Sequence, residues 1–237
     1  MKGIEMSHTR VVQGRISEIF SSIQGEGIYV GIPMIFIRFS GCNQRCSYCD
    51  TSFFEFEEMS IEAVVDRVKI QVSQGTKFIS LTGGEPLLQA EFILELLPHL
   101  KKEGFFAYLE TNSTLPDRLD EIKEFVDVIS ADIKLPSAAK SVPLWEKHRI
   151  FLEIALSSEA EVFTKAVITE DTDPEDIDYL ADFLSAIDSG ITLVLQPDST
   201  TISGKLMERI LSFQKLCLAK LRDVRIIPQM HKLLGLK

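Results

Sequence analysis

Short apolar runs alternate along the chain with longer segments in which apolar residues recur every three or four positions. The short runs are typical of buried strands, and the longer segments are typical of helices with one packed face. Ser60 directly precedes the first helical segment and can cap it, because its hydroxyl can accept from a main-chain N–H of the first turn. The predicted strands are 34–39, 78–82, 105–110, 126–132, 163–169, 191–196 and 224–227. The predicted helices are 61–72, 90–102, 117–125, 142–157, 174–187 and 203–219.

Strand and helix segments alternate throughout, and no linker rich in Pro, Gly or Ser interrupts them. This order predicts βα units with a parallel sheet, so we expect an α/β fold in one domain, residues 1–237. Polar or glycine-rich residues follow nearly every strand, at 38–51, 82–86, 110–112, 132–134, 170 and 196–198. In a barrel these segments meet at one mouth, where such folds carry out their chemistry. We therefore expect an incomplete TIM-like barrel of parallel strands with outer helices, and the alternative is a doubly wound open sheet.

The composition is that of an ordinary globular protein, with 45% hydrophobic and 25% charged residues. A net charge of −10 at pH 7 lacks the positive surface that general nucleic-acid binding needs, so we expect no nucleic-acid partner. Residues 1–15 contain no apolar signal core, and no run has the length that spans a bilayer. We expect no membrane association and a cytoplasmic location, where a cysteine cluster favours metal over disulfide.

Three cysteines, Cys42, Cys46 and Cys49, follow one another at close spacing after the first predicted strand. Structural zinc sites close with four protein ligands, and ordinary iron–sulfur clusters are held by four cysteines. Three close thiolates without a fourth therefore predict a [4Fe-4S] cluster in which one iron stays open to another ligand. An open iron indicates that chemistry takes place there. The remaining cysteine, Cys217, lies in a helical apolar pattern and is predicted to be a buried core residue.

The alternative for the three cysteines is a structural zinc site that takes a distant histidine as its fourth ligand. The histidines available for this are His8, His99, His148 and His231. Structural zinc motifs commonly pair their ligands in two short knuckles, and the sequence has no second knuckle. The spacing therefore favours the iron–sulfur cluster, and the zinc site stays open as an alternative.

Two further motifs accompany the cysteines. Tyr48 stands directly before Cys49, and residues 83–86, Gly-Gly-Glu-Pro, follow the next strand. Together with the cysteine spacing they resemble the radical S-adenosylmethionine superfamily. The resemblance implies that S-adenosylmethionine chelates the open iron and is cleaved by a cluster electron to a 5'-deoxyadenosyl radical. Two adjacent glycines also suit a site where main chain closely approaches a small ligand.

A narrower resemblance covers nearly the whole chain. It rests on residues 20–27, 31–33, 36–38, 41–43, 49–51, 110–112, 130–134, 195–197 and 229–232. These segments are similar to those of the 7-carboxy-7-deazaguanine synthase family. The resemblance implies a carbon–nitrogen lyase that converts 6-carboxy-5,6,7,8-tetrahydropterin to 7-carboxy-7-deazaguanine and ammonia, in queuosine and 7-deazapurine biosynthesis. S-Adenosylmethionine then serves as a catalytic cofactor, and Mg²⁺ assists.

Two other functions remain as alternatives. Another radical enzyme of similar length, such as a glycyl-radical activase, lacks the Gln-Gly-Glu-Gly leader of residues 24–27 in this relation to the cysteines. A noncatalytic zinc or electron-transfer module would be colourless, or would hold a cluster indifferent to S-adenosylmethionine. A dinucleotide-binding loop at Gly25, Gly27 and Gly31 is disfavoured, because these glycines precede a strand and do not open a helix.

The resemblance assigns a substrate pocket to eight residues. These are Ile23, Gln24, Gly25, Glu26, Arg38, Thr82, His231 and Lys237. The Gln24 amide offers a donor and an acceptor to a pterin edge, and Glu26 can accept from amino-pyrimidine N–H groups. Arg38 interrupts an apolar strand, and a buried guanidinium needs an anion. The substrate carboxylate is one candidate for that anion, and an internal Asp or Glu is the other.

The resemblance also assigns cofactor and metal contacts. Those to S-adenosylmethionine are Tyr48, Asp50, Gly84, Thr111, Ser130, Asp132, Lys134 and Gln196. Asp132 and Lys134 alternate with apolar residues, so both can face the barrel mouth, and a mutual ion pair is the alternative. Thr51 is assigned to Mg²⁺, which commonly takes few protein ligands, whereas by itself it is typical of a turn. The implied partners are a reductase or flavodoxin-type electron donor and a second copy in a homodimer.

Overall fold

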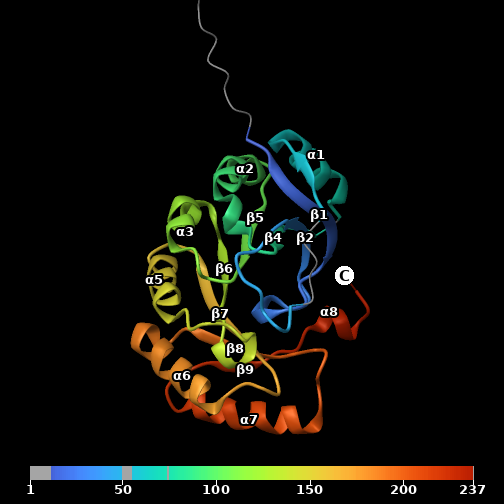
Figure 1. Ribbon diagram of the computed structural model, residues 1–237. Coiled ribbons are helices and arrows are strands. Elements are labelled where there is room, and N and C mark those ends of the chain that lie inside the picture. Colours follow the sequence, from blue (N-terminus) through green and yellow to red (C-terminus); the bar gives the residue numbers. More distant parts are fainter. Residues whose placement is uncertain (1–11, 50–54, 74, 237) are drawn as a thin grey trace, which may run out of the picture.

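The computed structural model describes residues 12–49, 55–73 and 75–236, and in this part of the chain nine strands form one sheet of order β3-β1-β2-β4-β5-β6-β7-β8-β9. The strands are β1 Gly14–Ile23, β2 Pro33–Phe39, β3 Glu57–Met59, β4 Phe78–Gly83, β5 Phe106–Thr111, β6 Val128–Asp132, β7 Glu161–Ile168, β8 Thr192–Pro197 and β9 Val224–Ile226. Figure 1 shows the sheet curled on itself, with the larger helices arranged along its outer side.

The seven predicted strands are confirmed, and consecutive members from β2 to β9, with β3 set apart, pair in parallel. The sheet order ends at β9 on one side and β3 on the other, so the sheet is an unclosed barrel as predicted. The prediction left out β1 and β3, which pair antiparallel at one edge. β1 is half buried and carries polar residues, and β3 is a short, acidic edge strand, so neither has the continuous apolar run of a central strand.

The helices lie near their predicted positions. They are α1 Ile61–Gln71, α2 Ala90–Lys102, α3 Pro116–Ile122, α5 Trp145–Leu156, α6 Pro174–Asp188 and α7 Gly204–Leu218. The short segments α4 Pro136–Ala139, α8 Met230–Leu233, η1 Gly27–Tyr29, η2 Pro86–Gln89 and η3 Lys123–Phe125 were not predicted as separate elements. Their one or two turns are too short to show a helical period. None of the helices in the described residues has the length and apolar run that a membrane crossing needs.

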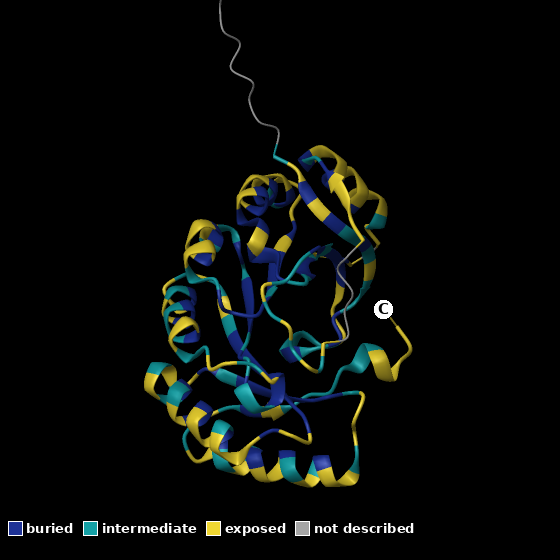
Figure 2. Ribbon diagram, viewed as in Figure 1, coloured by how far each residue is buried: buried dark blue, intermediate teal, exposed yellow. Residues whose placement is uncertain are grey.

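The main core lies between the sheet and the outer helices. Figure 2 shows buried strands and helices whose outward faces are exposed. The Ser60 hydroxyl accepts from the main-chain N–H of Ala63 at 3.3 Å, so the predicted cap of α1 is confirmed. Cys217 is fully buried on α7, as its helical pattern predicted. The outer helices thus cover one face of the sheet, and the opposite face is the inner face of the barrel.

A second, smaller core fills the barrel interior. Its members are Met34, Phe36, Tyr108, Val128, Phe163 and Val194, with Ile28 and Tyr29 packed against them. Gly27 has φ +65°, and a Cβ there would lie 2.6 Å from the fully buried ring of Phe163. Along β7, Phe163 belongs to this interior core, whereas Lys165 and Val167 line a cavity. Because side chains two apart share a face of a strand, the interior core supports the cavity from below along β7.

A pair of glycine substitutions tests this interior packing. Gly27→Ala and Gly31→Ala both place a Cβ on main chain with positive φ, of +65° and +89°, but only the Cβ at Gly27 meets another residue within 4 Å. We expect Gly31→Ala to lower the free energy of unfolding by about 1–2 kcal/mol. Gly27→Ala should lose about 1–3 kcal/mol more, because overpacking a buried ring is also destabilising. Denaturant unfolding of both variants checks this, and equal losses would contradict the packing of η1 on Phe163.

Candidate active site

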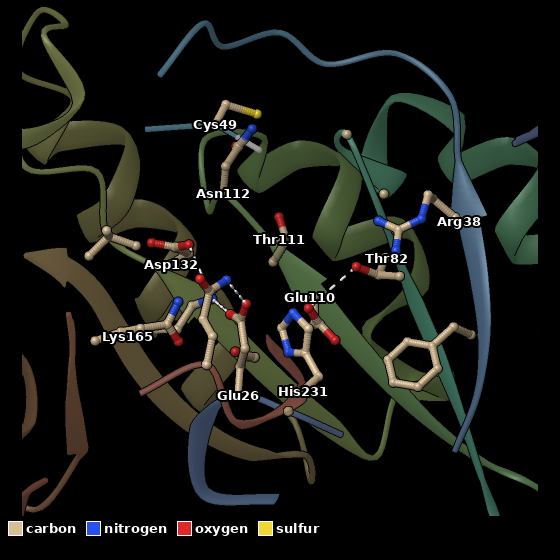
Figure 3. A pocket seen from close by; sticks show the side chains of 18 of the residues that line it. Glu26, Arg38, Cys49, Thr82, Glu110, Thr111, Asn112, Asp132, Lys165 and His231 are labelled. Carbon is tan, nitrogen blue, oxygen red and sulfur yellow. Dashed lines mark hydrogen bonds and ion pairs between the residues drawn. The ribbon is translucent and has the colours of Figure 1, made fainter. Parts of the chain in front are cut away.

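One cavity of about 850 Å³ lies where the parallel strands end, and it collects polar side chains from β1, β2 and β4 to β8. Every predicted site residue that the structure describes lines it. These are Cys42, Cys46, Cys49, Ile23, Gln24, Gly25, Glu26, Arg38, Thr82, His231, Tyr48, Gly84, Thr111, Ser130, Asp132, Lys134 and Gln196. Asp50, Thr51 and Lys237 lie outside the described residues. In Figure 3, Arg38 and Thr82 face Asp132, Lys165 and Glu26 across the cavity.

The three cysteines occupy one part of the cavity wall. Cys42 and Cys46 are partly buried and Cys49 is exposed. Burial raises the pKa of the Cys42 and Cys46 thiols. Within residues 12–49, 55–73 and 75–236, no three His, Cys, Asp or Glu side chains are close enough together to hold a single metal ion. A [4Fe-4S] cluster binds each thiolate through a different iron, so soft thiolates along one wall fit it without meeting at one point.

The histidines offered for a zinc site have other surroundings. His148 is fully buried, one ring nitrogen lies 3.2 Å from the Ser113 carbonyl oxygen, and the other accepts from the main-chain N–H of Lys134 at 3.3 Å. Burial lowers the pKa of His148 to about 4, so its ring is neutral at pH 7. His99 lies on α2, away from the cavity residues, and His8 is outside the described chain. His231 does line the cavity, together with the predicted substrate residues.

Glycines let the cysteine loop lie against the end of β4. The main-chain N–H of Gly84 donates to the Phe39 carbonyl at 3.1 Å, and that of Glu85 donates to the Gly41 carbonyl at 2.8 Å. A Cβ at Gly84 would lie 2.0 Å from the Gly41 carbonyl oxygen. This contact involves main chain, which cannot move aside as a flexible side chain would. A side chain at Gly84 would therefore displace the cysteine loop.

Glu85 holds the ends of β4 and β5 together from inside. Its fully buried carboxylate accepts from the main-chain N–H groups of Leu87 at 3.0 Å and Asn112 at 2.7 Å, and from the Thr111 hydroxyl at 2.9 Å. Burial raises the pKa of Glu85 to about 7, although these hydrogen bonds oppose the rise. The Asn112 amide in turn donates to Asn43 in the cysteine loop at 2.8 Å. This network connects the loop to two strands.

Four cavity-lining residues each have a buried polar atom without a hydrogen-bond partner among the described residues. The atoms are Asp132 Oδ1, Gln196 Oε1 and the hydroxyls of Tyr48 and Ser17. Buried polar atoms are nearly always paired in folded proteins, so these four indicate a ligand with polar groups of its own. Asp132, Gln196 and Tyr48 belong to the set that sequence resemblance assigned to S-adenosylmethionine, and Ser17 does not. The cofactor's hydroxyl and amino groups fit two acceptors and one hydroxyl of this kind.

Four charged side chains of alternating sign run through the cavity as an ionic chain: Glu26, Lys165, Asp132 and Lys134. Lys165 pairs with Glu26 and lies 3.5 Å from Asp132 Oδ2, and the same oxygen is 2.9 Å from Lys134 Nζ. The mutual ion pair considered for Asp132 and Lys134 is therefore present, and both still line the cavity. Burial by itself would lower the pKa of Lys134, but Asp132 and Tyr48 nearby raise it, so it stays charged.

The predicted substrate residues form a second network. Gln24 Nε2 donates to Glu110 at 2.8 Å, and Gln24 Oε1 accepts from the main-chain N–H of Glu26 at 3.0 Å. The hydroxyls of Ser80 and Thr82 also donate to Glu110, at 2.9 and 3.3 Å. Glu110 therefore accepts from two residues of β4 and from the segment directly after β1, at the predicted pterin pocket, and it fixes which way the Gln24 amide points.

Arg38 lies near an internal carboxylate, one of the two anions that its sequence context offered. Its Nε lies 3.8 Å from a Glu18 oxygen, at the outer limit of an ion pair, and its guanidinium lies 5.6 Å from the ring centre of Phe20. The same side chain lines the cavity and is 24% exposed. The internal carboxylate is thus present at long range, and the guanidinium can also receive an anion from the cavity.

The segment around α8 packs on the Gln24 to Glu26 leader. The main-chain N–H of Met230 donates to the Gly25 carbonyl at 2.8 Å, and Gln229 Nε2 donates to Glu26 Oε1 at 2.6 Å. A Cβ at Gly25 would lie 2.1 Å from His231 Nδ1, so glycine is needed for this approach. His231 therefore lies directly beside the predicted substrate segment.

Five residues of the site were not predicted individually: Glu85, Glu110, Asn112, Lys165 and Gln229. Four of them, Glu85, Glu110, Asn112 and Gln229, belong to motifs on which the family resemblance rests. The sequence therefore indicated that these positions belong to the site, but not what each side chain does. Lys165 carried the same signal as Arg38, a cation inside an apolar strand. That signal was available in the sequence and was applied only to Arg38.

The chain is similar to known proteins in sequence and in fold. The Radical SAM superfamily family model matches residues 36–184. The 7-carboxy-7-deazaguanine synthase of Geobacter sulfurreducens is 37% identical, with 93% of this chain and 96% of that protein covered, and that of Methanopyrus kandleri is 36% identical, with 92% of each covered. The crystal structure of QueE from Escherichia coli, 22% identical, shares the fold with a TM-score of 0.64 over 92% of this chain and 95% of that one. The chain therefore belongs to the 7-carboxy-7-deazaguanine synthase family of the radical S-adenosylmethionine superfamily.

Proposed function

We propose that the protein catalyses the conversion of 6-carboxy-5,6,7,8-tetrahydropterin to 7-carboxy-7-deazaguanine and ammonia in the described cavity, as the family name implies. The observation that carries this proposal is the composition of one cavity. Cys42, Cys46 and Cys49 line part of its wall, and Gln24, Glu26 and Arg38 line another part. The residues that would hold a radical source and those that would hold an anionic pterin thus line one cavity, as hydrogen abstraction from a bound substrate requires.

The cofactors supply the radical chemistry, and the protein binds and orients the cofactors and the substrate. When bound, the [4Fe-4S] cluster and S-adenosylmethionine supply one-electron reduction and hydrogen-atom abstraction. The three cysteines would hold the cluster. Asp132 and Gln196 would accept from S-adenosylmethionine, and Tyr48 would donate to it, because their buried polar atoms have no partner among the described residues. Gly84, Thr111, Ser130 and Lys134 would complete that part of the cavity.

Glu26 and Gln24 would recognise the amino-pyrimidine edge of the pterin. Burial alone would raise the pKa of Glu26, but Lys165 and the Gln229 amide outweigh it and lower the pKa to about 2. Glu26 is therefore an anion at neutral pH, and its carboxylate has acceptor sites beyond the two occupied by Lys165 and Gln229. Ile23 and Gly25 would contribute main-chain groups to the same edge.

Arg38 would bind the substrate carboxylate, with Thr82 beside it. A guanidinium binds a carboxylate through two parallel hydrogen bonds, which fixes orientation as well as affinity. With the pyrimidine edge at Glu26 and the carboxylate at Arg38, the pterin would be held at both ends. His231 packs on Gly25 and would close the pocket over the substrate.

Further proposals rest on the family resemblance. They are Mg²⁺ at Thr51, S-adenosylmethionine contact at Asp50, and substrate contact at the Lys237 carboxylate, all outside the described residues. Mg²⁺ keeps most of its ligands as water and substrate oxygens, so one threonine hydroxyl can suffice from the protein. We also propose a flavodoxin-type or reductase electron donor, a homodimer, one domain over residues 1–237 and a cytoplasmic location.

The direct test is anaerobic incubation of the reconstituted protein with reductant, S-adenosylmethionine and the carboxytetrahydropterin, followed by mass analysis. The deazaguanine acid should form, with S-adenosylmethionine recovered intact. Reductive cleavage of S-adenosylmethionine without this product would favour another radical enzyme, such as a glycyl-radical activase. A colourless protein that binds zinc would reject both readings in favour of a noncatalytic module.

Arg38→Met should weaken pterin binding, because it removes the charge that faces the substrate carboxylate. Hydrogen bonds to charged groups contribute about 1.5–3 kcal/mol, so the KM for the pterin should rise about 10- to 150-fold. The matched control is Arg15→Met, an exposed arginine on the neighbouring β1 that does not line the cavity. Steady-state kinetics on the carboxylated pterin and on a pterin without the carboxylate give the comparison. A similar rise in KM for both substrates would show that Arg38 does not bind the carboxylate.

Thr51→Ala should weaken the response to Mg²⁺. Loss of even outer partners of a metal ligand lowers metal affinity by about 10–100-fold, so half-maximal stimulation should require at least about tenfold more Mg²⁺. Turnover measured after chelation and Mg²⁺ titration gives this value for both proteins. Metal-dependent turnover that persists unchanged in the variant would remove Thr51 as the ligand.

A further inference from the structure

Lys165 lies at the centre of the ionic chain, between the predicted substrate and cofactor sides. It sits on β7 in register with Asp132 on β6, so the two side chains emerge side by side on one face of the sheet. Its side chain is 9% exposed and lines the cavity. Figure 3 shows it directed toward Glu26 and Asp132. A lysine this deeply buried is rare unless it is paired.

The pairing keeps Lys165 charged. Burial by itself lowers the pKa of Lys165, but Glu26, Asp132 and Glu110 around it more than reverse this, and the net shift is upward. Lys165 is therefore a cation at neutral pH, on a side chain that is largely buried. A buried cation of this kind fixes the positions and the charge of the carboxylates that face it.

Lys165 is a more important counter-charge for Glu26 than it is for Asp132. Glu26 Oε2 pairs with Lys165, whereas among the described residues its other oxygen accepts from the neutral Gln229 amide. His231 is the other cationic influence on Glu26, and it is the weakest of those that lower its pKa. Asp132, in contrast, keeps Lys134 at 2.9 Å without Lys165. Removal of Lys165 would leave the partly buried Glu26 carboxylate without its main counter-charge.

We propose that Lys165 is a positioning residue for the pterin: it holds Glu26 as an anion, aimed into the cavity, so that Glu26 can accept from the amino-pyrimidine N–H groups. The inference rests on the proposed function for the identity of the substrate. Lys165 acts through Glu26, and its contact with Asp132 ties the substrate side of the cavity to the cofactor side. Cofactor binding depends less on Lys165, because Lys134 remains at Asp132.

The groups that face Glu26 decide the expected pH dependence. They are Lys165 on β7, Gln229 and His231 near α8, and, through Lys165, Asp132 and Lys134 on or after β6 and Glu110 on β5. In the native protein the pKa of Glu26 is about 2, so Glu26 does not titrate in the working range. Without Lys165, burial raises that pKa, and the Gln229 hydrogen bond and His231 remain as weaker opposing influences. Pterin binding should then be present above the raised pKa and be lost as pH falls through it.

The experiment compares Lys165→Met, Lys165→Arg, Glu26→Gln and the double variant Glu26→Gln with Lys165→Met, all with the cluster loaded. Equilibrium dialysis gives pterin affinity from pH 6 to 9, and steady-state kinetics give KM and kcat for the pterin and for S-adenosylmethionine. Lys102→Met, an exposed lysine on α2, serves as the matched control and should leave all values unchanged.

We expect Lys165→Met to weaken pterin binding about tenfold or more, with an acid limb that the native protein lacks. Lys165→Arg should retain a flat profile and stay within a few-fold of native affinity. The affinity for S-adenosylmethionine should change much less than that for the pterin. In the Glu26→Gln background the Lys165→Met change should have little further effect, because the residue through which Lys165 acts is gone.

Multiplicative losses in the double variant, or an unchanged pH profile in Lys165→Met, would overturn the inference. If Lys165→Met fails to fold, a folded double variant supports the pairing, whereas failure of both shows that Lys165 serves the fold and not Glu26. The dialysis readout separates this inference from the proposed function. Native protein that binds the pterin but forms no deazaguanine acid would reject the function and leave the role of Lys165 to be decided by the binding profiles.

Discussion

The site is organised around buried charges that must be paired. Glu26, Lys165, Asp132 and Lys134 alternate in sign through the cavity, and each lies where an unpaired charge would be strongly unfavourable. The chain of pairs connects the segment after β1 with β7 and with the end of β6. Because these elements are far apart in the sequence, the ionic chain sets the relative position of the predicted substrate and cofactor sides.

The two sides of the cavity are anchored by different physical means. The cysteine loop is held by main-chain contact at Gly84 and by the buried carboxylate of Glu85, which allow little adjustment. The leader that carries Glu26 is held by the packing of η1 on the barrel interior, through Gly27 and Phe163, and by the segment around α8. The cluster wall and the substrate wall are therefore anchored by different contacts, and the ionic chain connects them.

Much of this arrangement could be predicted from the sequence because the rules involved are local or topological. Cysteine spacing is local, and the carboxyl ends of parallel strands meet at one mouth whatever the side chains. β1 was missed because its residues are half buried and polar, and its role as an edge partner of β2 appears only in the folded sheet. Lys165 carried a local signal, a cation inside an apolar strand, but its partners lie 139 positions away at Glu26 and 33 away at Asp132, so its role could not be predicted from that signal.

The measurement that tests the central claim most directly is an anaerobic crystal structure of the protein with its cluster, S-adenosylmethionine and the carboxytetrahydropterin. The pterin should lie with its amino-pyrimidine edge at Glu26 and its carboxylate at Arg38. S-Adenosylmethionine should donate hydrogen bonds to Asp132 Oδ1 and Gln196 Oε1, which have no partner among the described residues. Lys165 should still bridge Glu26 and Asp132. A pterin bound away from Glu26, or a Lys165 that leaves Glu26 when substrate binds, would contradict this account.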